Sequence, residues 1–423
     1  MSPLNHHRNI IGAVIACHFI SAISTLGLAP FIGVIVQKGF GLPISAATGM
    51  LYVLPTLLTA ISAPFWGRLA DKSNKKTQLL RAQFGLSLSF LLAAFSIGTL
   101  WLFIVALVLQ GILGGTLAAA NGYMAAIIDD HKTKNFHRKS LSDTLNLSQF
   151  SARSAFLIAP IIIGFLLSHQ STGFIYLLLA LITLLSALFM CYLLPGDTQS
   201  TQKKNLNVKA ELLKQNRPNA NLSWSFLLLG NFMLSFTLVM SFPYFIPLVS
   251  SINPNIYGTW AGFLFGLPHG VYLISLFFIQ KRCKRYQNHL AIFSIAFAIL
   301  GISILLQGLS HSISILFLLR LLMGFSMTFC YVSLNHLIAN GHFKHREGHY
   351  FAWLDSLNKY GGVIAGICAG IIFAGLNVYW VFIGAGLIAV GYGFLISLNH
   401  YSPLALLAKK PASNNDKNTK DFL

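Results

Sequence analysis

Acidic residues are scarce in this chain of 423 residues, which has 10 Asp and Glu against 29 Lys and Arg and a formal net charge of +19. Charged residues make up only 9% of the sequence. A protein that binds nucleic acid carries its cations on a polar surface or stripe, whereas here the cations stand between long apolar runs. The composition therefore argues against an ordinary soluble domain and against a nucleic-acid partner.

The usual signatures of catalysis and metal binding are missing as well. The sequence contains no HExxH, no GxSxG and no GxxxxGK[ST], which disfavours an intramembrane enzyme and an ATP-driven pump. Its five cysteines form no CxxC pair, and we interpret them as packing residues. In "GHFKHREGHYF", Lys344 and Arg346 alternate with histidines and would repel a cation. We therefore expect no enzyme activity, no metal and no cofactor.

Long apolar segments dominate the chain, which is 55% hydrophobic and contains 34 Phe. A helix needs about 20 apolar residues to cross the hydrocarbon of a bilayer, where its backbone must bond within the segment. The sequence predicts an all-α polytopic membrane protein with twelve transmembrane helices. We expect these helices at 9–37, 44–70, 77–98, 100–128, 140–167, 172–195, 222–250, 256–280, 288–309, 312–340, 349–376 and 378–399. Pro243 and Pro247 are expected to break the seventh of them near its outer end.

The cations are distributed unevenly between alternate connections. If the N-terminus is cytoplasmic, the connections on that side hold nearly all of the loop Lys and Arg, and the opposite connections hold only Lys38. Because Lys and Arg are enriched in cytoplasmic loops, this asymmetry predicts that both termini lie in the cytoplasm.

The chain carries an internal repeat. A shift of 213 residues superimposes three pairs of residues, and a shift of 212 superimposes "DTLN" (143–146) on "DSLN" (355–358). The three pairs are Pro30 with Pro243, Pro55 with Pro268 and Gly111 with Gly324. Duplicated halves are common in secondary transporters.

The repeat and a polar, basic central stretch predict the domain organisation. We expect an N-terminal six-helix bundle at 1–195, a cytoplasmic linker at 196–221, a C-terminal six-helix bundle at 222–400 and a cytoplasmic tail at 401–423.

The loop "GRLADKSNKK" resembles the signature between the second and third helices of the major facilitator superfamily. In that pattern a Gly is followed four residues later by an Asp, then by a basic residue, and then by a second Gly with further cations. The matching residues are Gly67, Asp71, Lys72, Lys75 and Lys76. Asn74 stands where the second Gly is usual, and Asn tolerates a left-handed turn better than most residues. The resemblance implies the major facilitator fold and a gating role for this loop, in which Asp71 latches cytoplasmic helix ends.

Two further stretches narrow the resemblance. "APIIIG" on helix five is similar to the "GPxxGG" element of the superfamily's exporters, with Pro160 and Gly164 kept. "LLRAQFGLSLSFLLAAFS" and "LVLQGILGGTLAAANGYMAA" resemble the branch of siderophore exporters for alcaligin, vibrioferrin and legiobactin. The resemblance implies a monomeric exporter in the bacterial inner membrane. Drug–proton exporters usually carry an Arg four residues before a Gly on helix four; here Leu107 precedes Gly111, so their proton-coupling scheme does not transfer.

Polar and ionisable residues inside the spans are candidates for function, because charge in hydrocarbon is costly. On helix five, Asp143, Asn146, Gln149 and Arg153 recur at three- and four-residue steps and share one face. Arg153 is expected roughly 18 Å from the cytoplasmic end of the helix, near the bilayer centre.

The second half offers a similar set, with Asp355, Asn358 and Lys359 on helix eleven and Arg320 on helix ten, about 12 Å from its outer end. Cations exceed acids at depth, which predicts a positive cavity that binds a small anion such as a citrate-like polycarboxylate. The expected substrate-binding residues are Arg153, Arg320, Lys359, Gln149, Asn146 and Asn358. In the alternative interpretation, these charges hold helices together and Lys359 pairs with Asp355.

Proton coupling needs a titratable group within the bundle. His18 on helix one is a candidate because imidazole titrates near neutral pH, and Asp143 and Asp355 are the other two. The charges predict a secondary transporter of an organic anion, and the resemblance implies that it exports an anionic siderophore, with proton exchange as the expected energy source. An importer of a siderophore or another organic anion, and a multidrug efflux transporter, remain the alternatives.

Overall fold

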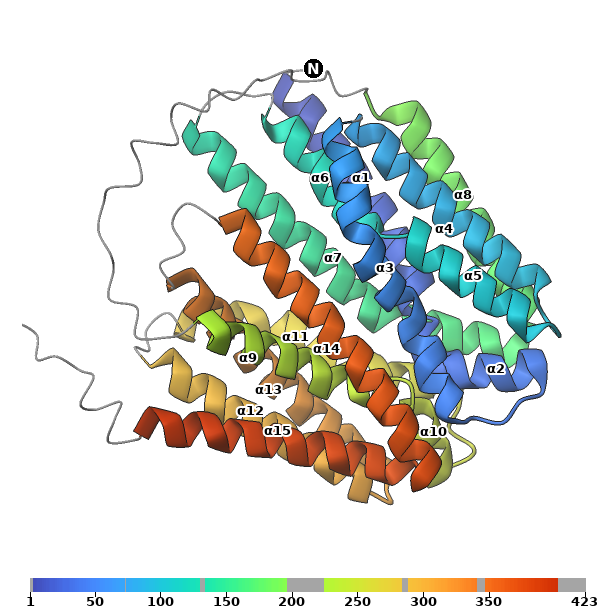
Figure 1. The fold of residues 1–423 in the computed structure, drawn as a ribbon, viewed down its shortest axis with the longest axis vertical. Helices are drawn as coiled ribbons and strands as arrows, with labels where there is room; N and C mark the ends of the chain where they lie inside the picture. The colour runs from blue at the N-terminus through green and yellow to red at the C-terminus, as the bar shows by residue number, and fades with distance from the viewer. Residues whose placement is uncertain are drawn as a thin grey trace, which may run out of the picture.

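The computed structural model describes residues 3–72, 74–129, 134–195, 224–283, 288–340 and 347–401. The predicted linker at 196–221 and residues 402–423 of the predicted tail lie outside these ranges. All the regular elements of the described residues are helices (Figure 1). The predicted all-α membrane fold is therefore confirmed.

The first half of the chain forms one bundle, in which α1 packs on α7, α4 on α8 and α3 on α5. Its helices are α1 (Pro3–Leu26), η1 (Ala29–Phe31), α2 (Ile32–Phe40), α3 (Ala46–Lys72), α4 (Lys75–Phe95), α5 (Leu100–Leu113), α6 (Thr116–Asp129), α7 (Lys134–His169) and α8 (Thr172–Leu193).

The second half forms a second bundle, in which α12 packs on α13 and α15, and α9 on α14. Its helices are α9 (Trp224–Met240), α10 (Phe245–Ile252), α11 (Thr259–Cys283), α12 (His289–Leu309), α13 (Ile313–Asn340), α14 (Glu347–Gly375) and α15 (Val378–Tyr401). In Figure 1 the blue-to-green bundle lies beside the yellow-to-red one.

Twelve membrane spans can be counted in the described residues. Eleven stretches are long and apolar enough to cross a membrane, and the pair Ser225–Met240 and Phe245–Ile252, bent by 40°, makes a twelfth. The bend surrounds Pro243, which confirms the expected break in the seventh span, whereas Pro247 lies within α10. Pro cannot donate a backbone hydrogen bond, and it kinks the helix that contains it.

Two other breaks were not anticipated. The first predicted span is interrupted at η1, which contains Pro30, the repeat partner of Pro243. The fourth predicted span divides into α5 and α6 at Gly114 and Gly115, where Gly115 has a φ of 82°. That left-handed conformation is one that Gly adopts without steric cost.

The repeat also has a counterpart in packing. A Cβ on Gly111 would lie 2.7 Å from the carbonyl oxygen of Pro55, and a Cβ on Gly324 would lie 2.8 Å from that of Pro268. Each contact brings a proline-kinked helix against the glycine of another helix. The two bundles therefore repeat the same helix pair at the same register.

Candidate substrate cavity

A cavity of about 420 Å³ lies between the two bundles, and we call it the central cavity. The α1–α8 bundle contributes polar and apolar residues in similar numbers, and the α9–α15 bundle contributes polar, aliphatic and aromatic ones. Polar lining residues of the first bundle include His18, Thr56, Thr59, Gln110, Gln149 and Arg153. Those of the second bundle include Ser235, His269, Tyr331, Asn358 and Lys359. The volume is within the range of small-molecule sites.

The cavity is closed at one end by close packing between the bundles. We call this end the far side, marked by residues 41–45 and 253–258, and the opposite end the linker side, marked by Leu193 and Trp224. On the far side α7 packs on α11, and α3 packs on α14. A Cβ on Gly262 of α11 would overlap the carbonyl oxygen of Pro160, and Tyr244 donates a hydrogen bond to the carbonyl oxygen of Ser45 at 3.0 Å.

The contacts between the bundles gather on one side of the cavity. Among the described residues, hydrogen bonds and ring contacts between the bundles lie at Arg153 or on the far side of it. The side chains at the linker-side ends of α7 and α14 lie outside the described ones. The described contacts thus close the central cavity on the far side.

Arg153 reaches from α7 across the interface to the second bundle. Its Nη1 lies 3.5 Å from Nδ1 of His269, and its guanidinium lies over the rings of Tyr331 at 4.5 Å and Tyr272 at 5.0 Å. Among the side chains that the structure describes, Lys359 and Asp355 form an ion pair, and Arg153 has no carboxylate partner. Cation–π contacts hold the guanidinium in place, and its charge faces the central cavity.

Lys359 also lines the central cavity, from α14. Its Nζ lies 2.7 Å from Oδ2 of Asp355 one turn earlier, an arrangement that the alternative interpretation anticipated. The Asp355 side chain is 63% exposed, so solvent screens this pair. Asn358 lines the cavity as well, and its backbone carbonyl accepts a hydrogen bond from Ser235 at 2.6 Å.

Arg320 lies outside the lining of the central cavity and is 1% exposed. Pro268 of α11 has no N–H, which leaves the carbonyl oxygen of Leu264 without its partner within the helix. Arg320 Nε donates to that oxygen at 2.9 Å, and Nη2 donates to the carbonyl oxygen of Phe265. Its guanidinium also lies 4.1 Å from the Phe245 ring. The structure therefore places this cation on the kink of α11, away from the other predicted binding residues.

The three proton-coupling candidates occupy different environments. His18 is 4% exposed and lines the central cavity, and neither ring nitrogen has a hydrogen-bond partner. Asp355 is paired with Lys359. Asp143 and the predicted ligand Asn146 lie on α7, but their side chains are outside the described part of the structure, whereas Gln149 on the same helix lines the cavity.

Asn74 in the basic loop has a structural role of its own. With a φ of −66° and a ψ of 130°, it is extended and does not use the left-handed conformation that Asn tolerates. Its side chain accepts hydrogen bonds from the backbone of Lys76 and Thr77 and caps α4. Lys76 Nζ donates to the carbonyl oxygen of Cys191 at 3.0 Å and to that of Leu194. This cation satisfies acceptors at the end of α8.

The structure describes the side chains of only some residues of the predicted gate. Gly67 is exposed on α3, and Lys75 begins α4. Asp71 and Lys72 end α3, but their side chains lie outside the described ones. A latch at Asp71 therefore stays a prediction.

The exporter-like element at Pro160 and Gly164 belongs to the fifth predicted span, which is α7 in the structure. It lies at the interface between α7 and α11. A Cβ on Gly164 would overlap the carbonyl of Gly258. The element thus belongs to the far-side closure.

Sequence reasoning missed the residues that surround Arg153, namely His269, Tyr272, Tyr331 and Phe156. The available signal was His269, a lone imidazole beside Pro268 in an apolar run. The aromatic residues gave no signal, because aromatic residues are common throughout the spans.

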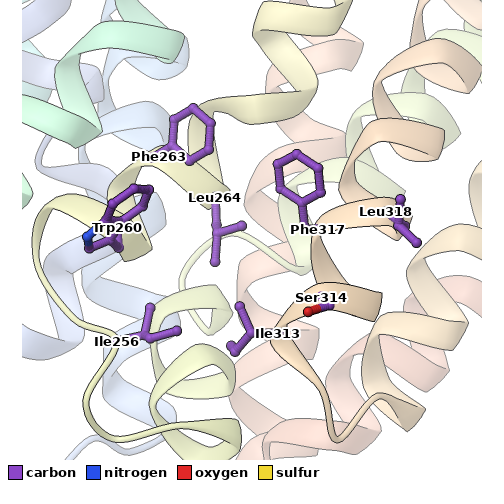
Figure 2. Close-up of a pocket in the computed structure, with 8 residues that line it drawn as sticks. All are labelled: Ile256, Trp260, Phe263, Leu264, Ile313, Ser314, Phe317 and Leu318. Atoms are coloured by element: carbon purple, nitrogen blue, oxygen red, sulfur yellow. The ribbon is translucent and has the colours of Figure 1, made fainter.

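A second hollow of about 450 Å³ lies at the periphery of the second bundle, between the start of α11 and the start of α13 (Figure 2). Its lining is apolar apart from Ser314, and Trp260 there is 68% exposed. It contains none of the predicted site residues.

Comparison with known proteins shows the family. Residues 14–306 match the model described as Major Facilitator Superfamily. The chain belongs to this superfamily. Members of the superfamily are transporters and not enzymes, in agreement with the missing catalytic motifs. The major facilitator fold and the secondary-transporter class predicted from the sequence are confirmed.

Within the superfamily, the chain is similar to proteins named multidrug resistance protein MdtG. The protein from Klebsiella pneumoniae (strain 342) is 27% identical over 209 residues, 48% of each chain. The protein from Salmonella newport (strain SL254) is 29% identical over 196 residues, 45% of each chain. The chain thus matches about half the length of these curated relatives. Both names refer to multidrug resistance, and neither mentions a siderophore.

Solved structures support the fold over nearly the whole chain. The human organic anion transporter MFSD10 (TETRAN) has a TM-score of 0.65 at 16% identity, covering 94% of this chain and 100% of that one. A POT family transporter in complex with 5-aminolevulinic acid has a TM-score of 0.71 at 13% identity, covering 95% and 96%.

Proposed function

We propose that this major facilitator protein exports an organic anion by alternating access, with Arg153 as the ligand of the anionic group. The observation that carries the proposal is the charge of the central cavity. Arg153 and Lys359 line it, and its described lining residues include no carboxylate. A partly desolvated arginine without a carboxylate partner favours an anion, which it can bind through two parallel hydrogen bonds.

Within this class we propose a carboxylate siderophore as the substrate, in the inner membrane of a bacterium. The support is the resemblance of two stretches of the first half to siderophore exporters, together with the exporter-like element at Pro160 and Gly164. Proton exchange is the proposed energy source. His18 is the candidate carrier that lies within the central cavity with both ring nitrogens unpaired.

The test compares a deletion strain with its parent and with strains that carry the wild-type chain, Arg153→Gln or Arg282→Gln. Arg282 is the matched control, because it is exposed at the linker-side end of α11. Siderophore is quantified by mass spectrometry in the supernatant and in the cells. We expect lower secretion with intracellular accumulation in the deletion strain, restored by wild type and Arg282→Gln and not by Arg153→Gln.

Normal secretion with failed uptake of the ferric siderophore would contradict export and favour an importer. Multidrug efflux is the second candidate function, and the similarity to proteins named MdtG favours it. It predicts that deletion sensitises cells to unrelated drugs while siderophore secretion stays normal.

A further inference from the structure

The central cavity has an aromatic corner that the anion proposal leaves without a role. Phe156 of α7 stacks on His269 of α11, with ring centroids 4.5 Å apart and an interplanar angle of 16°. Phe242 meets Phe156 edge-on at 6.2 Å and His269 at 6.3 Å. All three side chains line the central cavity. Phe156 is half-buried, whereas Phe242 and His269 are buried behind it, so the corner presents mainly the Phe156 ring to whatever the cavity holds.

This corner lies one helical turn from the proposed anion ligand. Arg153 and Phe156 are three residues apart on α7, so their Cβ atoms are about 5–6 Å apart on one face. Both side chains line the cavity and are half-buried. A carboxylate joined to a ring, directly or through a few atoms, spans that separation.

The second bundle completes the corner with apolar surface. Leu238 and Val239 of α9 line the same cavity, and Tyr331 of α13 contributes a ring beneath Arg153. A polycarboxylate without a ring would bind Arg153 but would place charged groups against this apolar surface. A ligand with an apolar ring would cover it and remove apolar surface from water.

We propose that the corner formed by Phe156, Phe242 and His269 is a subsite for a flat aromatic ring of the substrate, whose carboxylate binds Arg153. The inference rests on the proposed function, and it narrows the substrate class from organic anions to aromatic carboxylates. His269 acts here as a positioning residue, because its ring supports one face of Phe156 and its Nδ1 lies beside Arg153.

Three probes separate the two parts of the site. Binding of 2-naphthoate (ring and anion), 2-naphthylmethylammonium (ring and cation) and tricarballylate (carboxylates without a ring) is measured by titration calorimetry. The full chain is reconstituted in nanodiscs, and empty nanodiscs give the blank for partition into lipid. We expect 2-naphthoate to bind at least tenfold more tightly than either other probe.

Substitutions on α7 assign the effect to the corner. Phe156→Ala should weaken 2-naphthoate binding about tenfold and change tricarballylate binding less than twofold. Phe165→Ala is the matched control, because Phe165 lies on the same helix and is 52% exposed. If Phe156→Ala does not fold, Phe156→Leu keeps an apolar side chain without the ring, and the same selective loss is expected.

Several results would overturn the subsite. One is that 2-naphthoate does not bind. Another is that the Phe156 variants lose affinity for 2-naphthoate and tricarballylate equally. A third is that tricarballylate binds as tightly as 2-naphthoate, and this result leaves the anion proposal standing. Tighter binding of 2-naphthylmethylammonium than of 2-naphthoate would overturn both proposals.

Discussion

Arg153 and Arg320 both lie within candidate membrane-spanning helices, and their contacts indicate different roles. Arg320 is buried, and its donors bind backbone carbonyls at the kink of α11. Arg153 lies over two tyrosine rings and lines the central cavity. The sequence could identify both as costly charges. It could not show which one is held by backbone oxygens, because those oxygens belong to another helix.

The role of Arg320 can be tested with a double-mutant cycle. Arg320→Gln should lower the free energy of unfolding by about 2–4 kcal/mol, because it leaves buried carbonyl oxygens unpaired. In a Pro268→Ala background the cost should shrink by about 1 kcal/mol or more, since the substitution restores a backbone N–H that can donate to the Leu264 carbonyl. Chemical denaturation in detergent measures the free energy of unfolding of the wild type, the two single variants and the double variant. An identical cost in both backgrounds would contradict the account.

The Lys359–Asp355 pair offers a second test at this scale. Asp355→Asn should raise the affinity for an organic anion about two- to fivefold, because it releases Lys359 from a screened partner worth about 1 kcal/mol or less. Lys359→Gln should lower that affinity. Binding titrations in nanodiscs measure both, and a lower affinity in Asp355→Asn would count against Lys359 as an anion ligand.

At the scale of elements, hydropathy predicted the spans but not all of their breaks. Pro243 gave a visible signal for the bend before α10. Gly115 did not, because a positive φ is a property of tertiary context and a glycine inside an apolar run fits a continuous helix equally well. The N-cap role of Asn74 was not predicted for a related reason, since Asn suits both a left-handed turn and a helix N-cap.

Glycines recur every four residues along α11, starting just before the helix, and they face α7. They are at positions 258, 262, 266 and 270. Gly262→Ala should open the far side, because the new Cβ would overlap the Pro160 carbonyl. Spin labels at Leu42 and Tyr257, both exposed on the far side, should then report a longer distance in a cysteine-free background. Gly391→Ala on α15 is the control, since a Cβ there has no neighbour within 4 Å. An unchanged distance distribution in Gly262→Ala would show that this contact does not hold the gate.

At the scale of the whole molecule, the repeat and the fold class were predictable from the sequence, whereas the conformational state was not. The offset of 213 residues identifies equivalent prolines and glycines. Which end of the cavity is closed depends on contacts between α7 and α11 and between α3 and α14, which the sequence does not specify. With both termini in the cytoplasm, as predicted, the closed far side would face away from the cytoplasm.

That orientation has its own test. Alkaline phosphatase inserted at Asn255 in the far-side loop should be active, and the same insertion at Lys209 in the central linker should be inactive, because the enzyme is active only outside the cytoplasm. The opposite pattern would invert the topology.

The central claim is that Arg153 recognises the anionic group of a transported substrate. Counterflow in proteoliposomes tests it most directly, because exchange requires neither a known orientation nor a coupling ion. Vesicles loaded with unlabelled 2,6-naphthalenedicarboxylate should accumulate the labelled dianion through the wild-type chain and Arg282→Gln, and at least tenfold more slowly through Arg153→Gln. Equal exchange by Arg153→Gln and wild type would contradict the account.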